Sequence, residues 1–198
     1  MSLLSGQHVV AVDTETTGLS PAEGHALVEV ATVALDDAAL GEGWSSLVKP
    51  GRPIPPDAAA VHGITDAMVA DAPPGEGIAA ELVRRCGERT LVFHNVAFDL
   101  PFLKALLREA GVPALRNPII DTLGLARGLN GPGSNSLGAL AARLGLPPET
   151  KHRALGDART TARLLLALSE RWESERGVRS LAELAAISQD MLRLSPVR

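Results

Sequence analysis

One short segment constrains the fold of this chain more than any other, an apolar run that ends in two acidic residues. Residues 9–12 (Val-Val-Ala-Val) are mostly β-branched, which predicts a buried strand, and Asp13-Thr14-Glu15-Thr16-Thr17-Gly18 follows directly. Because successive strand side chains point to opposite faces, Asp13 and Glu15 should share one face at the strand's end. Two adjacent carboxylates repel each other unless a cation lies between them, and their oxygens suit Mg²⁺ or Mn²⁺. Taken alone, the segment is explained equally well by a solvated strand end.

The composition predicts one folded domain without an internal disulfide or a cysteine metal cage. The chain has 198 residues, of which 45% are apolar, and its single cysteine, Cys86, excludes an internal disulfide and a cysteine metal cage. The net charge of −4 excludes a broadly basic nucleic-acid-binding module. It does not exclude an enzyme that holds nucleic acid through bound cations. Since no apolar run could span a bilayer and no signal peptide is visible, we expect a cytoplasmic protein.

The order of the predicted elements indicates an α/β domain with a mixed sheet, because three meandering strands precede an alternation of strands and helices. Strands are predicted over residues 7–15, 26–35 (followed by a hairpin at 36–41), 43–49, 90–94 and a short segment ending at Asp121. Helices are predicted over residues 64–69, 75–86, 97–110, 137–144 and from Asp157 onward, with loops at 49–56 and 128–135. We expect one domain over residues 1–176, followed at 177–198 by a helix or tail that could bind a partner.

Two further acidic elements lie where a helix begins. His94-Asn95-Val96-Ala97-Phe98-Asp99 leads from a strand into a helix, with Asp99 in the first turn. His152-Arg153-Ala154-Leu155-Gly156-Asp157 follows a proline pair and opens the long helix at Asp157. An aspartate in a first helical turn is favoured by the helix dipole or acts as a cap, so each element alone has a structural explanation.

Taken together, these segments carry the blocks D-x-E-T-T-G, H-N-x-x-F-D and H-x-A-L-x-D in this order. On these blocks, the sequence from about Val9 to Leu168 resembles the DEDDh exonuclease family, which includes the proofreading epsilon subunit of bacterial DNA polymerase III. Residues 61–65 and 121–123 also resemble the family's intervening segments. The related tyrosine subclass is excluded because the chain contains no tyrosine. The resemblance implies a ribonuclease H-like fold, a five-stranded mixed β-sheet flanked by α-helices.

The resemblance also implies an activity, the release of nucleoside 5′-monophosphates from single-stranded DNA 3′ ends with two divalent cations, in proofreading or repair. Asp13 would bridge the two cations, Glu15 and Asp157 would bind one of them, and Asp99 would support the other. His152 would be the general base that deprotonates the attacking water. The implied substrate contacts are Thr16, Thr17, Gly18, Leu19, Asp57, His62 and Phe98.

Several of these residues have structural alternatives. Phe98 could pack in the core, and His62 could stabilise its turn. We read Asp121 as a strand-end residue with a structural hydrogen-bonding role, and His8 and His25 as surface residues.

Alternatives also remain for the function as a whole. The same blocks serve exoribonucleases that trim RNA ends, and a non-catalytic domain could bind nucleic acid or a polymerase. Loss of an acidic position would mark the non-catalytic domain, and all four are present. Expected partners are single-stranded DNA ends and a DNA polymerase catalytic subunit or sliding clamp. Residues 189–194 loosely resemble clamp-binding peptides.

Overall fold

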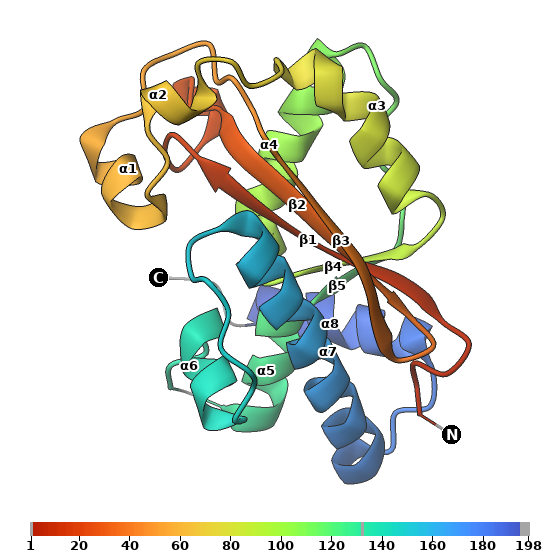
Figure 1. The fold of residues 1–198 in the computed structure, drawn as a ribbon. Helices are drawn as coiled ribbons and strands as arrows, with labels where there is room; N and C mark the ends of the chain where they lie inside the picture. Colours follow the sequence, from red (N-terminus) through yellow and green to blue (C-terminus); the bar gives the residue numbers. More distant parts are fainter. Residues whose placement is uncertain (1, 132, 195–198) are drawn as a thin grey trace.

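The computed structural model describes residues 2–131 and 133–194 and is built around a five-stranded mixed sheet (Figure 1). Its strands are β1 (His8–Thr16), β2 (Leu27–Asp36), β3 (Ala39–Leu47), β4 (Thr90–Phe93) and β5 (Ile119–Asp121). They lie in the order β3-β2-β1-β4-β5. β2 is antiparallel to β1 and β3, whereas β4 is parallel to β1 and β5. The predicted sheet and fold class are therefore confirmed.

Helices cover both faces of the sheet (Figure 1). One face packs against α3 (Gly75–Cys86) and α4 (Val96–Glu109). The other packs against α5 (Thr122–Asn130), α6 (Leu137–Arg143), α7 (Ala154–Arg176) and α8 (Leu181–Leu194). The short η1 (Pro21–Glu23), α1 (Pro56–His62) and α2 (Asp66–Val69) complete the described chain. Among the described helices, none is long and apolar enough to cross a membrane.

Side chains alternate along β1, and this alternation determines which residues lie on each face of the sheet. Val10 and Val12 pack in the core beneath α3 and α4, whereas Val9 and Ala11 pack on the face covered by α7. Past the apolar run, the same alternation turns residues 13 and 15 toward α7 and residue 14 toward α4. Because β4 is parallel to β1, the helix after β4 begins at the same end of the sheet. The end of β1 is therefore where three elements meet.

Two parts of the N-terminal half differ from the sequence prediction. The hairpin between β2 and β3 is a two-residue turn at Asp37 and Ala38, whose φ angles of 51° and 62° are both left-handed. The expected Asn-Gly or Asp-Gly signal for such a turn is absent, so the predicted third strand began too late, at residue 43. Helix α1 was not predicted, because prolines precede it; Pro56 is tolerated in its first turn, where the missing amide has no helical partner.

The predicted loop at residues 128–135 was wrong in its first part, because α5 runs through Gly128. Two glycines in α5 allow neighbouring residues to approach the helix closely, and the sequence alone does not reveal these contacts. A Cβ on Gly128 would lie 2.6 Å from the Trp172 ring, and one on Gly124 would lie 2.1 Å from the Ser188 carbonyl oxygen of α8. The segment after Gly177 forms α8, which packs on α5 and β5 through buried Leu184 and Ser188. Residues 195–198 lie outside the described residues.

We expect Gly124→Ala to lower the free energy of unfolding by about 1–3 kcal/mol, because the new methyl group would push α8 away from α5. Gly138→Ala in α6 is the matched control, since the nearest atom to its Cβ would be the end of the flexible Lys151 side chain at 3.8 Å. The control should be neutral or stabilising by up to about 1 kcal/mol. Urea denaturation measures both, and equal stability of the two variants would contradict this packing.

Candidate active site

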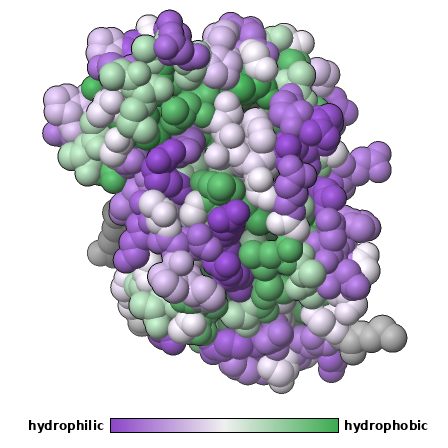
Figure 2. Space-filling model, in the orientation of Figure 1, coloured by the Kyte–Doolittle hydropathy of each residue, from purple (hydrophilic) through white to green (hydrophobic). Residues whose placement is uncertain are grey.

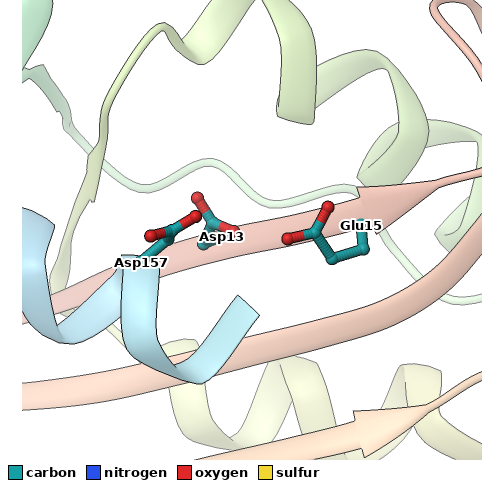
Figure 3. Close-up of side chains that lie close together, drawn as sticks. All are labelled: Asp13, Glu15 and Asp157. Atoms are coloured by element: carbon teal, nitrogen blue, oxygen red, sulfur yellow. The ribbon is translucent and has the colours of Figure 1, made fainter. Parts of the chain in front are cut away.

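Three carboxylates meet at the end of β1. Asp13 and Glu15 come from that strand, and Asp157 comes from the first turn of α7. One oxygen from each lies within 4.8 Å of the other two, and Figure 3 shows the three side chains turned toward one another. We call these three residues the acidic cluster. The sequence predicted all three as metal ligands, and the fold brings them together from positions up to 144 residues apart along the chain.

The acidic cluster is electrostatically unfavourable without a cation. Burial, followed by the charges of Asp99, Asp157 and Glu15, raises the pKa of Asp13 well above its usual range. Burial and the charge of Asp157 raise the pKa of Glu15 to about 8. Burial also raises the pKa of Asp157, although the His152 amide that bonds to it opposes the shift. Each of the three carboxylates therefore resists ionisation chiefly because it is buried, and Asp13 and Glu15 also because neighbouring carboxylates carry charge.

Asp99 lies beside the acidic cluster but is held separately. It is 4% exposed, and the Thr14 hydroxyl donates a 2.6 Å hydrogen bond to its Oδ1. Burial raises the pKa of Asp99 to about 7 in spite of this bond. Thr14 was not among the predicted site residues; its position between Asp13 and Glu15 on the opposite strand face is the signal that could have found it.

This donor set fits a divalent cation. Carboxylate oxygens are hard ligands of the kind that Mg²⁺ and Mn²⁺ prefer, and a bound positive charge would relieve the repulsion that raises the pKa of these groups. The chain thus contains a candidate metal site made of Asp13, Glu15 and Asp157, with Asp99 as a neighbour.

His152 lies on the loop that leads into α7, with an exposed side chain and a left-handed backbone (φ 53°). Its amide donates a 3.1 Å hydrogen bond to Oδ2 of Asp157, which ties the loop to the acidic cluster. His152 and Asp157 both line a cavity of about 480 Å³ that extends along Leu137 and Ala141 of α6. The His152 side chain is therefore close to Asp157 and open to solvent.

Among the predicted substrate residues of the Thr-Thr-Gly turn, Thr16 and Thr17 are buried, whereas Leu19 is exposed. The Thr16 hydroxyl donates to the Gly18 carbonyl at 2.7 Å, and Thr17 Oγ1 accepts from the Ala26 amide at 3.0 Å. These bonds fix the turn from which Leu19, 80% exposed, projects into solvent. Figure 2 shows further apolar atoms gathered where Figure 1 places α1 and α2.

The other residues predicted to contact substrate differ in how exposed their side chains are. His62 is 5% exposed; its Nδ1 accepts from the Ile64 amide at 3.0 Å, which leaves the proton on Nε2 when the ring is neutral. Burial lowers the pKa of His62, although the nearby Thr16 backbone opposes this shift. In the described structure, Nε2 has no hydrogen-bond partner of good geometry. Phe98 is half-buried and packs on Phe102 at 5.6 Å between ring centroids, in line with core packing. Asp57 is exposed in α1.

The structural role predicted for Asp121 is confirmed. Its buried carboxylate accepts from the amides of Asn95, Val96 and Leu123 at 3.1, 2.7 and 2.8 Å. His8 is exposed, as predicted, whereas His25 is at the surface only in part. The His25 side chain is only 22% exposed, because its ring packs on Gly18, where a Cβ would lie 2.3 Å from it.

Sequence reasoning missed an ion pair next to the site, between buried Glu29 of β2 and partly exposed Arg153. The signal was present, since Glu29 is a charged residue inside a strand whose neighbours Val28 and Val30 are fully buried. A charge at such a position requires a partner.

The fold and the acidic cluster define a nuclease of the ribonuclease H-like type. Residues 10–165 match the family model described as exonuclease, and the chain belongs to this family, among its DEDDh members. It is similar to a solved structure of exonuclease X in complex with 5′ overhanging duplex DNA, with 33% identity, a TM-score of 0.71, and 91% of this chain and 99% of that chain covered. The nuclease domain of 3′hExo, described as a DEDDh family member, shares the fold, with a TM-score of 0.71 at 16% identity over 83% of this chain and 92% of that chain.

Curated relatives include polymerase subunits. The chain is 34% identical to the DNA polymerase III subunit epsilon of Pasteurella multocida, over 94% of this chain and 82% of that protein. It is 43% identical to a DNA polymerase III subunit epsilon-like protein of Rhodobacter capsulatus, over 80% of this chain. The match spans only 23% of the length of that second relative.

The acidic cluster should make stability depend on pH in metal-free protein. The pKa of Glu15 is about 8 in the folded state against 4.5 for the free group, so between these values the folded chain binds more protons than the unfolded chain. The free energy of unfolding should therefore fall as pH rises through this range, and the contribution present below pH 4.5 should be lost above about pH 8. Urea denaturation in EDTA across this range measures the slope.

Two comparisons sharpen this measurement. Mg²⁺ or Mn²⁺ should restore stability more at the high end of the range than at the low end. Asp13→Asn should flatten the slope in EDTA, because it removes a second carboxyl group whose pKa is raised in the folded state. A stability that rises with pH in metal-free wild-type protein would contradict this account of the site.

Proposed function

We propose that this protein is a metal-dependent 3′→5′ exonuclease that releases nucleoside 5′-monophosphates from single-stranded DNA 3′ ends in proofreading or repair. The observation that carries the proposal is the acidic cluster, with Asp99 beside it, at the end of the central strand of an exonuclease-family chain. DNA is favoured over RNA by the relatives named as DNA polymerase III subunits and by the exonuclease X complex with duplex DNA.

The proposal includes two divalent cations, Mg²⁺ or Mn²⁺. Asp13, Glu15 and Asp157 would hold one, and Asp99, together with Asp13, would support the second. Such ions stabilise negative charge on the attacking and leaving oxygens of a phosphodiester. The fold contributes the fixed geometry, because Asp13 and Glu15 lie on a paired central strand and Asp157 on a long packed helix.

His152 is proposed as the general base. An exposed imidazole can take a proton from the attacking water and pass it to solvent. The bond from its amide to Asp157 keeps the loop at the edge of the acidic cluster.

The terminal nucleotide is proposed to lie against the Thr-Thr-Gly turn. Leu19 would contact the base, and His62, whose Nε2 is buried in the free protein, would have to turn outward to reach the sugar or phosphate. Phe98, half-buried between core and surface, would form the floor of the same pocket. Asp57 is the weaker candidate, because it is exposed on the outer part of α1.

Association with a DNA polymerase catalytic subunit or a sliding clamp, and a cytoplasmic location, belong to the same proposal. The clamp-like residues 189–194 lie inside α8, where the Gln189 side-chain nitrogen is buried and Leu192 packs on the core. This segment would have to leave α5 and β5 before it could bind a clamp as an extended peptide.

Asp13→Ala and EDTA should each abolish degradation of a single-stranded DNA oligonucleotide, because both remove metal binding at the acidic cluster. The assay follows a 5′-labelled oligonucleotide on a gel and identifies the released mononucleotides by mass spectrometry. A matched RNA oligonucleotide, run in parallel, distinguishes DNA from RNA as substrate. Full activity in EDTA would refute the mechanism, and an inactive wild-type protein with either substrate would favour a non-catalytic binding domain.

His152→Ala should lower kcat by ~10²–10⁴-fold, the usual contribution of a general base, and leave metal binding largely intact. Metal binding is measured independently of activity as the stabilisation that Mg²⁺ or Mn²⁺ gives in urea denaturation. The matched control is His8→Ala, because His8 is exposed at the opposite end of β1 and pairs with Asp36. A kcat of His152→Ala equal to that of the control would refute this role.

A further inference from the structure

Glu29 is a buried carboxylate directly beside the acidic cluster that does not join it. It lies opposite Glu15 in the β1–β2 register, and it is 2% exposed. Its charge is close enough to raise the pKa of Glu15, after the larger effects of burial and Asp157. A buried carboxylate at this place requires compensation, since an unpaired buried charge is strongly destabilising.

Both oxygens of Glu29 are occupied by the segment that follows His152. Arg153 donates from Nη2 to Oε1 at 2.8 Å and from Nε to Oε2 at 3.0 Å, which is the two-bond geometry of a guanidinium on a carboxylate. The amide of Ala154, the first residue of α7, donates to Oε2 at 3.0 Å. These bonds neutralise Glu29, and they explain why it is absent from the acidic cluster although it neighbours Glu15.

The same bonds fix the backbone on one side of His152, and Asp157 fixes it on the other. His152 has a left-handed backbone conformation, which costs energy for a residue with a side chain and persists only where its surroundings enforce it. Its amide is held by Asp157. A Cβ on Gly156 would lie 2.1 Å from the Thr150 carbonyl oxygen, so the loop also packs directly on the first turn of α7. Sheet, loop and helix are thus locked together at the histidine.

We propose that Glu29 and Arg153 are positioning residues, whose ion pair ties the start of α7 to β2 and thereby holds His152 beside the acidic cluster. This role rests on the proposed exonuclease function. Neither residue contacts the reacting atoms; both act through His152. The pair therefore links the strand that neighbours two of the cluster carboxylates to the loop that carries the base.

The first test is a double-mutant cycle between Arg153→Ala and His152→Ala. Circular dichroism checks that Arg153→Ala folds, because this variant leaves the buried Glu29 carboxylate bonded to the Ala154 amide without the charge of Arg153. In the wild-type background, Arg153→Ala should lower kcat by ~10–100-fold, the usual cost of losing a group that orients a site residue, with little change in KM. In the His152→Ala background it should cost less than about threefold, because the residue it positions is already gone. Additive losses would overturn the proposal.

The second test does not depend on activity. Amide hydrogen exchange of residues 152–154 should become faster in Arg153→Ala and stay unchanged in Arg171→Ala, which breaks an ion pair with Glu175 on the same helix. Arg153→Lys should recover only part of kcat, because lysine cannot form both bonds to Glu29. Unchanged exchange and kcat in Arg153→Ala would overturn this inference alone. A wild-type chain without nuclease activity would overturn the proposed function and, with it, any role of the pair in the reaction.

Discussion

Mutual repulsion between carboxylates at the end of β1 is the constraint on which the rest of the structure depends. Like charges placed this close separate unless the backbone that carries them is rigid, and here the rigidity comes from burial. β1 is paired on both sides and packed on both faces, and α7 buries most of one side against the sheet. Asp99 arrives from the other face and is held by Thr14. A cation-binding arrangement is therefore built into the strand before any cation is present.

Glu15 and Glu29 show how the protein distinguishes a carboxylate that can bind a metal from one that cannot. They are cross-strand neighbours in the same acidic surroundings. Glu29 is neutralised by Arg153 and the Ala154 amide, which use both of its oxygens. Among the described residues, none donates such bonds to Glu15, and its pKa is raised to about 8 by burial and by Asp157. The oxygens of Glu29 are thus occupied by protein donors, whereas the oxygens of Glu15 are available for a ligand, as its raised pKa also indicates.

The sequence predicted correctly those helices and strands whose pattern of apolar residues matches their burial in the fold. The helix at residues 75–86 and the strand at 90–94 follow from periodicity and β-branched runs, and the structure places them within a residue of the prediction. The differences from the prediction share another cause. Gly128 was read as a loop residue, but its missing side chain serves the approach of Trp172. His25 was read as a surface residue, but Gly18, seven residues earlier, leaves room for its ring. Such pairings depend on contacts that no window of sequence contains.

The sequence by itself indicated the chemistry of the site. Alternation along a strand puts Asp13 and Glu15 on one face, and the resemblance of the three blocks to the DEDDh family implied that Asp99 and Asp157 join them. Only the tertiary structure decided which of these groups meet. It placed Asp13, Glu15 and Asp157 in one cluster, set Asp99 beside it on Thr14, and paired Glu29 with Arg153. The physical reason is that electrostatic interactions and hydrogen bonds depend on distances in space, and these distances cannot be read from the order of residues along the chain.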